Sequence, residues 1–202
     1  MIEIHDDGAF LRVDGQGLDA LVAGDDDAAA AQARSPELVT AFREVRAQPL
    51  FWFELVTAGA DSVLVHRGWV DDEVMGLQLA LDESRWQVMV DAPDFLAAAL
   101  ARLVEVNPSL RSRDEAAPYA QVGLGSLTDQ DDGVRREALA SVGADMAWRL
   151  TCETDAAEWH VTAVDGASGP AVYSREGESF EPTTNTELFW LFATVREELM
   201  SP

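Results

Sequence analysis

Few residues of this chain have the types and spacing that catalysis or metal binding requires. The three histidines, His5, His66 and His160, lie far apart, and Cys152 is the single cysteine. No pair of these residues has the spacing of zinc ligands. The sequence therefore predicts no metal site and no catalytic residue.

Glycine-rich motifs give the same result. Gly15-Gln16-Gly17 lacks the third glycine of a dinucleotide fingerprint, and Gly123-Leu124-Gly125-Ser126 is neither a phosphate loop nor a nucleophile elbow. The chain contains no Lys, which removes Schiff-base chemistry and the phosphate-loop lysine. We therefore expect no cofactor and a protein that is not an enzyme.

Charge is the strongest signal in the composition. The 202 residues include 37 acidic and 14 basic ones, for a net charge of -23. Such a field repels nucleic acid and anionic membrane surfaces, and it favours a basic protein partner or simply solubility. All basic residues are Arg, which is typical of GC-rich genomes such as those of actinobacteria.

One turn combines an aromatic residue with several acids. Trp69 ends an expected strand, and Asp71, Asp72 and Glu73 form the tip of the connection from 68 to 73. An exposed aromatic side chain beside charges is a common anchor of protein interfaces. The alternative is that Trp69 folds onto the core as an ordinary strand-end residue. The sequence thus predicts a partner-binding site at Trp69, Asp71, Asp72 and Glu73.

The elements around this turn form an antiparallel meander with a helix after it. Strands are indicated by alternating apolar residues between 50 and 91, and their short connections favour antiparallel pairing. Apolar residues then recur at helical spacing from Phe95 to Val104, on one stripe that can cover the sheet.

A second copy of this plan follows between 147 and 200. Trp148, Leu150 and Cys152 alternate as Phe51, Phe53 and Leu55 do. Five tryptophans within regular elements, Trp190 among them, are expected to pack in the core or between elements. We predict one α+β domain over residues 1–202. Its quasi-equivalent halves, at about 35–106 and 128–200, are each an antiparallel β-meander followed by a sheet-covering α-helix, and 107–127 is the crossover.

These features resemble the EspG-type proteins, which are cytoplasmic chaperones of type VII secretion in actinobacteria. The likeness covers roughly residues 35–200 and rests on a helix starting Pro36-Glu37-Leu38, the triplet Gly68-Trp69-Val70, and the run WQVMVDAPDFLAAALARLV at 86–104. The resemblance implies a pseudo-symmetric fold whose sheet loops grip the tip of a helical PE–PPE pair. The connection from 68 to 73 is then the partner-binding loop.

The leading hypothesis is a chaperone-like factor for a type VII secretion substrate, and two alternatives stay open. One is an immunity-type inhibitor whose negative surface blocks a basic toxin. The other is a hydrolase that uses carboxylates, or His66 and His160, in a pocket between the halves. The N-terminus has no basic region followed by an apolar core, so we expect a cytoplasmic protein without membrane contact. The oligomeric state stays open, and an exposed edge strand could pair two chains into a homodimer.

Overall fold

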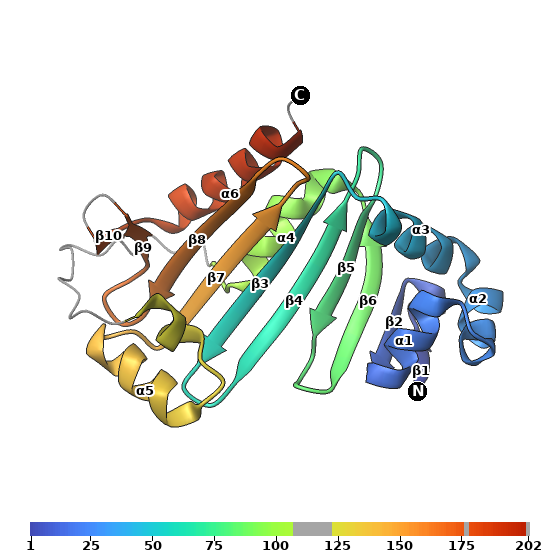
Figure 1. Ribbon diagram of the computed structural model, residues 1–202, viewed down its shortest axis with the longest axis horizontal. Coiled ribbons are helices and arrows are strands. Elements are labelled where there is room, and N and C mark those ends of the chain that lie inside the picture. Colours follow the sequence, from blue (N-terminus) through green and yellow to red (C-terminus); the bar gives the residue numbers. More distant parts are fainter. Residues whose placement is uncertain (107–122, 176–177, 201–202) are drawn as a thin grey trace.

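The computed structural model describes residues 1–106, 123–175 and 178–200. In this part of the chain, ten antiparallel strands form one sheet in the order β1-β2-β6-β5-β4-β3-β7-β8-β9-β10 (Figure 1). Six α-helices pack around it. The predicted α+β class is confirmed.

The strands take up the alternating segments of the sequence. In sheet order they are β1 (Ile2–His5), β2 (Phe10–Asp14), β6 (Arg85–Asp91), β5 (Met75–Ala80), β4 (Val63–Val70), β3 (Phe51–Gly59), β7 (Met146–Glu153), β8 (Glu158–Asp165), β9 (Ala171–Ser174) and β10 (Ser179–Pro182).

The two halves meet at the centre of the sheet. Strands β3 to β6 are followed by α4 (Leu96–Leu103), and β7 to β10 are followed by α6 (Asn185–Met200). The first strands of the two halves pair with each other, with Glu54 opposite Thr151. Most of the predicted crossover at 107–127 lies outside the described residues, and its end begins a 3-10 helix, η4 (Leu124–Thr128).

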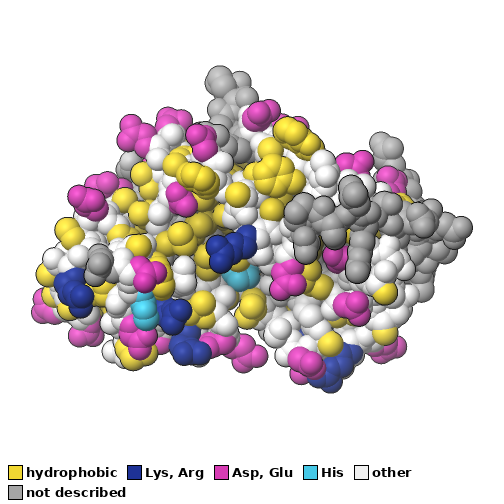
Figure 2. All heavy atoms as spheres, turned by 180° about the vertical axis from the view of Figure 1, so that it is seen from behind, with side chains coloured by type: hydrophobic (Ala, Val, Ile, Leu, Met, Phe, Trp, Pro, Cys, Tyr) yellow, Lys and Arg dark blue, Asp and Glu magenta, His cyan; other side chains and the backbone are white. Residues whose placement is uncertain are grey.

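Helices cover the two faces of the sheet differently. Helices α4 and α6 lie behind the sheet in Figure 1, and Figure 2 views this α4–α6 face from outside. On the opposite face, α3 (Pro36–Ala47) covers β4, β5 and β6, and α5 (Asp132–Ser141) lies beside β7 and β8 with η4 (Figure 1). The remaining short helices are η1 (Asp6–Gly8), α1 (Gly15–Ala23), η2 (Asp26–Ala28), α2 (Ala29–Arg34) and η3 (Pro93–Phe95).

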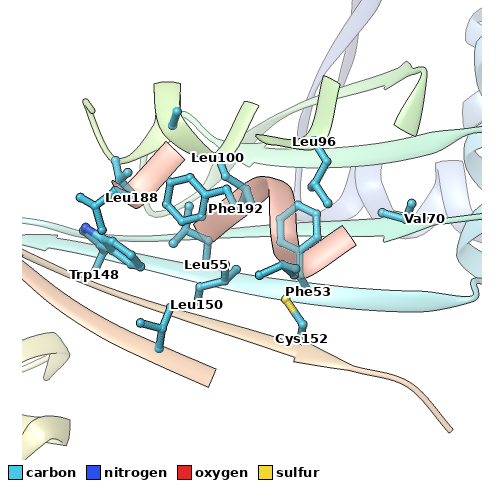
Figure 3. Packing of buried hydrophobic residues seen from close by; sticks show 14 of the residues in the cluster. Phe53, Leu55, Val70, Leu96, Leu100, Trp148, Leu150, Cys152, Leu188 and Phe192 are labelled. Atoms are coloured by element: carbon cyan, nitrogen blue, oxygen red, sulfur yellow. The ribbon is translucent and has the colours of Figure 1, made fainter. Parts of the chain in front are cut away.

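The main core lies between the sheet and the α4–α6 pair. Phe53 of β3 and Cys152 of β7 are register partners, and Leu100 and Phe192 reach down from the two helices (Figure 3). All four side chains are buried. Phe53 and Cys152 point to the helices because alternate strand residues share one face of the sheet. Burial also raises the pKa of the Cys152 thiol to about 12.

A second core lies under α3 on the opposite face. Phe42 and Val45 of α3 pack there with Leu11 of β2 and Val88 of β6. Gly76 of β5 allows this close approach, since a Cβ atom on it would lie 2.8 Å from Cγ1 of Val45. The N-terminal hairpin thus extends the sheet beyond the first half.

The helix starts show what local sequence determines. Before α6, Thr184 Oγ1 accepts the Glu187 N–H at 3.1 Å, and Glu187 Oε2 accepts the Thr184 N–H at 2.7 Å. This reciprocal pair is a capping box, and its hydrogen bonds lower the pKa of Glu187. Helix α5 begins at Asp132, because Asp131 caps it by accepting from the N–H groups of Gly133 and Val134.

Candidate protein-binding surfaces

Trp69 lies beneath α3 and not on the surface of its turn. Its side chain is 9% exposed. The ring of Phe42 meets it edge-on at a centroid distance of 5.7 Å, and the Arg46 guanidinium lies 4.5 Å from its ring centroid. Burial, followed by the nearby Arg67 charge, lowers the pKa of Arg46. The interpretation of Trp69 as an exposed anchor is wrong, and the alternative, a strand-end residue folded onto the core, is confirmed, because α3 covers this end of β4.

The acidic residues after Trp69 do form an exposed turn between β4 and β5. One of them is used internally: Asp71 Oδ1 accepts the N–H groups of Glu73 and Val74 at 2.8 and 2.6 Å. The side chains of Asp72 and Glu73 are exposed. Of the four predicted residues, the structure therefore leaves Asp72 and Glu73 free to face a partner, while Asp71 shapes the turn and Trp69 fixes the strand end.

A second acidic turn lies at the same end of the sheet. Trp52, near the start of β3, has Trp69 of β4 on one side and Glu153 of β7 on the other. The β4–β5 and β7–β8 turns therefore flank the start of β3, as Figure 1 shows. We call this surface the acidic end; its exposed carboxylates are Asp72, Glu73, Glu153, Asp155 and Glu158. Leu50 lies beside it and is 47% exposed. The surface combines negative charge with an exposed apolar side chain.

An exposed aromatic pair on α6 was not foreseen. Trp190 is 64% exposed and Phe189 is 40% exposed, with ring centroids 6.4 Å apart. The prediction that Trp190 packs in the core is wrong. The spacing of the buried residues Leu188, Phe192 and Val195 already places Trp190 off the apolar stripe. Helical periodicity, rather than residue type, would have found this exposed pair.

The arrangement of strands and helices matches a known structure over nearly its whole length. The match is to the Mycobacterium tuberculosis type VII secretion system chaperone EspG5, solved in complex with the PE25–PPE41 dimer. It covers 93% of this chain and 96% of the matched chain, with a TM-score of 0.58 and 13% sequence identity. The chain shares its fold with EspG5. No model of a known protein family matches the sequence, and no curated protein matches it either.

The likeness to EspG5 supports the resemblance drawn from the sequence at the level of the fold. Across the described residues, no helix is long and apolar enough to cross a membrane. Nor does any group of three or more His, Cys, Asp or Glu side chains in that part of the chain have a metal-binding arrangement.

The two strand histidines do not share a site. His66 lies on the α4–α6 face of β4, beside Thr57, and is 4% exposed. His160 is exposed, and it pairs with Thr151 on the opposite face, where it contacts Arg175. The centre of the seam between β3 and β7 is a filled core, since Phe53, Leu55, Leu150 and Cys152 occupy it (Figure 3). A groove that reaches from His66 to Asp145 lies beneath α4, and His160 does not line it. The pocket expected for a hydrolase is therefore not formed by these two histidines.

His66 should make folding stability depend on pH. Burial lowers the pKa of His66 from 6.5 to about 4, and its Nδ1 accepts the N–H of Ala80 at 3.1 Å. Between pH 6.5 and about 4 the unfolded chain binds a proton that the folded chain excludes, so stability falls as the pH falls. We expect His66→Gln to reduce this loss by on the order of 3 kcal/mol. Urea unfolding of both proteins at several pH values measures it; equal pH dependence would contradict the assignment.

Proposed function

We propose that this chain is a non-enzymatic, chaperone-like factor that binds a helical substrate of type VII secretion in the cytoplasm. The observation that carries the proposal is the likeness of fold to EspG5, which covers nearly all of both chains. EspG5 was solved with the PE25–PPE41 dimer bound. By analogy, the partner of this chain is a PE–PPE type heterodimer.

The acidic end is the surface that we assign to this partner. Asp72 and Glu73 provide exposed charges at its tip, and Leu50 provides an apolar contact beside them. Trp69 and Asp71 act from within, because the first holds the end of β4 under α3 and the second closes the turn. Complementary charge across such a surface speeds association and selects the partner, so the partner surface should be basic.

Reversing two charges at the acidic end should weaken the complex. We expect Asp72→Arg/Glu73→Arg to reduce the affinity for a purified PE–PPE heterodimer from the same genome at least tenfold, because like charges then face each other. Titration calorimetry or surface plasmon resonance at low salt measures the affinity. Both side chains are exposed, so the thermal midpoint should not move.

The matched control is Asp26→Arg/Asp27→Arg, which makes the same change in net charge at η2, far from the acidic end in Figure 1. It should leave the affinity nearly unchanged. Equal losses in both variants would mean that only the overall field matters, and no loss in either would remove the acidic end as the interface. If the wild-type chain binds no PE–PPE pair of its genome, the chaperone proposal fails.

The net charge of -23 and the acidic end also favour a second candidate, an immunity-type inhibitor of a basic toxin. Such a complex should lose affinity steeply with salt, because exposed charges are screened over about 10 Å at 0.1 M salt. Inhibition of a toxin encoded beside the gene, without binding to any PE–PPE pair, would select this candidate.

A further inference from the structure

Strands β4 and β5 pair over only part of their length. Their paired register runs from Val70–Met75 to Arg67–Gln78 and ends there. Each strand stays paired on its other side, β4 with β3 as far as Val63 and β5 with β6 as far as Ala80. The two strands therefore diverge toward the β3–β4 and β5–β6 turns (Figure 1). A fork opens inside an otherwise continuous sheet.

The alternation of hydrogen bonds shows which peptide groups face the fork. The Asp71 N–H donates to the Val74 carbonyl at the β4–β5 turn, so every second residue back along β4, including Val65 and Val63, turns its peptide group toward β5. The partner of Val65 in a continued ladder would be Ala80. The Ala80 N–H instead donates to Nδ1 of His66. The His66 imidazole thus accepts the hydrogen bond that the Val65 carbonyl would accept in a continued β4–β5 ladder.

Hollows lie on both faces of the fork and at its open end. We call this open end, between the β3–β4 and β5–β6 turns, the mouth. On the α4–α6 face a groove of about 910 Å³ runs between α4 and the sheet, with Leu64, His66 and Leu79 along the fork. A hollow of about 210 Å³ lies on the other face beside Val63 and Val65. A third, of about 430 Å³, lies between the two turns, where Leu64 and Leu81 meet Asp82 and Glu83. The hollows therefore lie beside the peptide groups of Val63 and Val65, which face the fork and do not pair with β5.

We propose that this free edge of β4 binds an extended peptide segment of a partner protein. The segment would add a short strand at Val63 and Val65, because an exposed strand edge recognises extended peptides through main-chain hydrogen bonds. Its apolar side chains would face the groove beneath α4, which Leu64 and Leu79 line. A helix satisfies its own backbone groups and gains nothing from this edge.

The charges around the fork indicate that the peptide should carry a basic residue. The mouth carries Asp82 and Glu83, and the groove carries three acids, Asp91, Glu105 and Asp145, against one base, Arg102. Asp82 is held by Arg85 at 2.5 Å, whereas Glu83 is exposed. The peptide should therefore bear Arg or Lys where it leaves the mouth. This site is separate from the acidic end and does not depend on the proposed chaperone function.

Selection from a phage-displayed library of random linear peptides tests the site. We expect enriched peptides that alternate apolar residues and carry a basic one, and that slow amide hydrogen exchange at Val63 and Val65 when bound. Leu81→Arg should weaken the best peptide at least tenfold, because it places a cation at the mouth. The control is Leu50→Arg at the other end of the sheet, since the two leucines are 41% and 47% exposed.

Three results would overturn the proposal. They are a library that yields no enriched peptide, a selected peptide that binds as a helix or leaves the exchange of Val63 and Val65 unchanged, and equal affinity for the Leu81→Arg and Leu50→Arg proteins. Because these readouts use peptides and not a PE–PPE heterodimer, they succeed or fail independently of the chaperone assignment.

Discussion

Phe192→Ala should lower the free energy of unfolding by about 3–5 kcal/mol, the usual cost of truncating a fully buried phenylalanine. The Phe192 side chain is 0% exposed and lies 5.5 Å from Trp148, ring centroid to ring centroid. It comes from α6 of the second half and packs over the seam with the first half (Figure 3). Its loss leaves a cavity that α4, α6 and the sheet must share. Urea denaturation followed by circular dichroism measures the change.

Trp190→Ala is the matched control, two residues away on the same helix. Trp190 is 64% exposed, and removing an exposed side chain outside the core usually changes stability by less than about 0.5 kcal/mol. If Trp190→Ala destabilised the chain as much as Phe192→Ala, α6 would have to present a different face to the sheet.

Arg135→Met should be the second strongly destabilising change, with an expected loss of about 2–3 kcal/mol. The guanidinium is 1% exposed and donates to the Gly59, Ala60 and Asp129 carbonyls at 2.7, 3.2 and 2.6 Å. It thus ties α5 to the β3–β4 turn. Met keeps most of the apolar stem but leaves acceptors without their donor. Thermal and urea unfolding measure the loss.

The neighbouring arginine supplies the comparison for this variant. Arg136 is 53% exposed and pairs with exposed Asp61 at 2.7 Å. A surface ion pair contributes little because water screens it, so Arg136→Met should unfold at nearly the wild-type urea concentration. Similar losses for the two arginines would show that the buried hydrogen bonds of Arg135 add nothing special.

Local patterns predicted much of the fold. The alternation of Phe51, Phe53 and Leu55 indicates which side of the strand is buried, and the helical spacing of apolar residues up to Val104 indicates the helix that covers the sheet. Both depend on neighbours in the chain, and the structure confirms both. The order of strands and closing helix in each half follows from the same local signals.

What the sequence could not predict depends on contacts between distant segments. The sequence left the burial of Trp69 open, and the contact with Phe42 of α3 decides it. The divergence of β4 and β5 beyond the Arg67–Gln78 pair has no local signal in either strand. The buried face of α5 is a further case: Val134 is 42% exposed, while Arg135 is buried. From the sequence alone, a charged helix residue is expected to be exposed to solvent. Its burial can be predicted only when the carbonyls that accept its hydrogen bonds are known.

The joint between β3 and β7 has a consequence for how the molecule folds. Each half contributes one wall of a shared core, and α4 and α6 pack against each other above it. The core beneath α4 and α6 contains side chains of both meanders, so opening one half exposes apolar surface of the other. The two halves should therefore melt together in one cooperative transition. Because the pairing of Glu54 with Thr151 joins distant segments, folding should also be slow for a chain of this size.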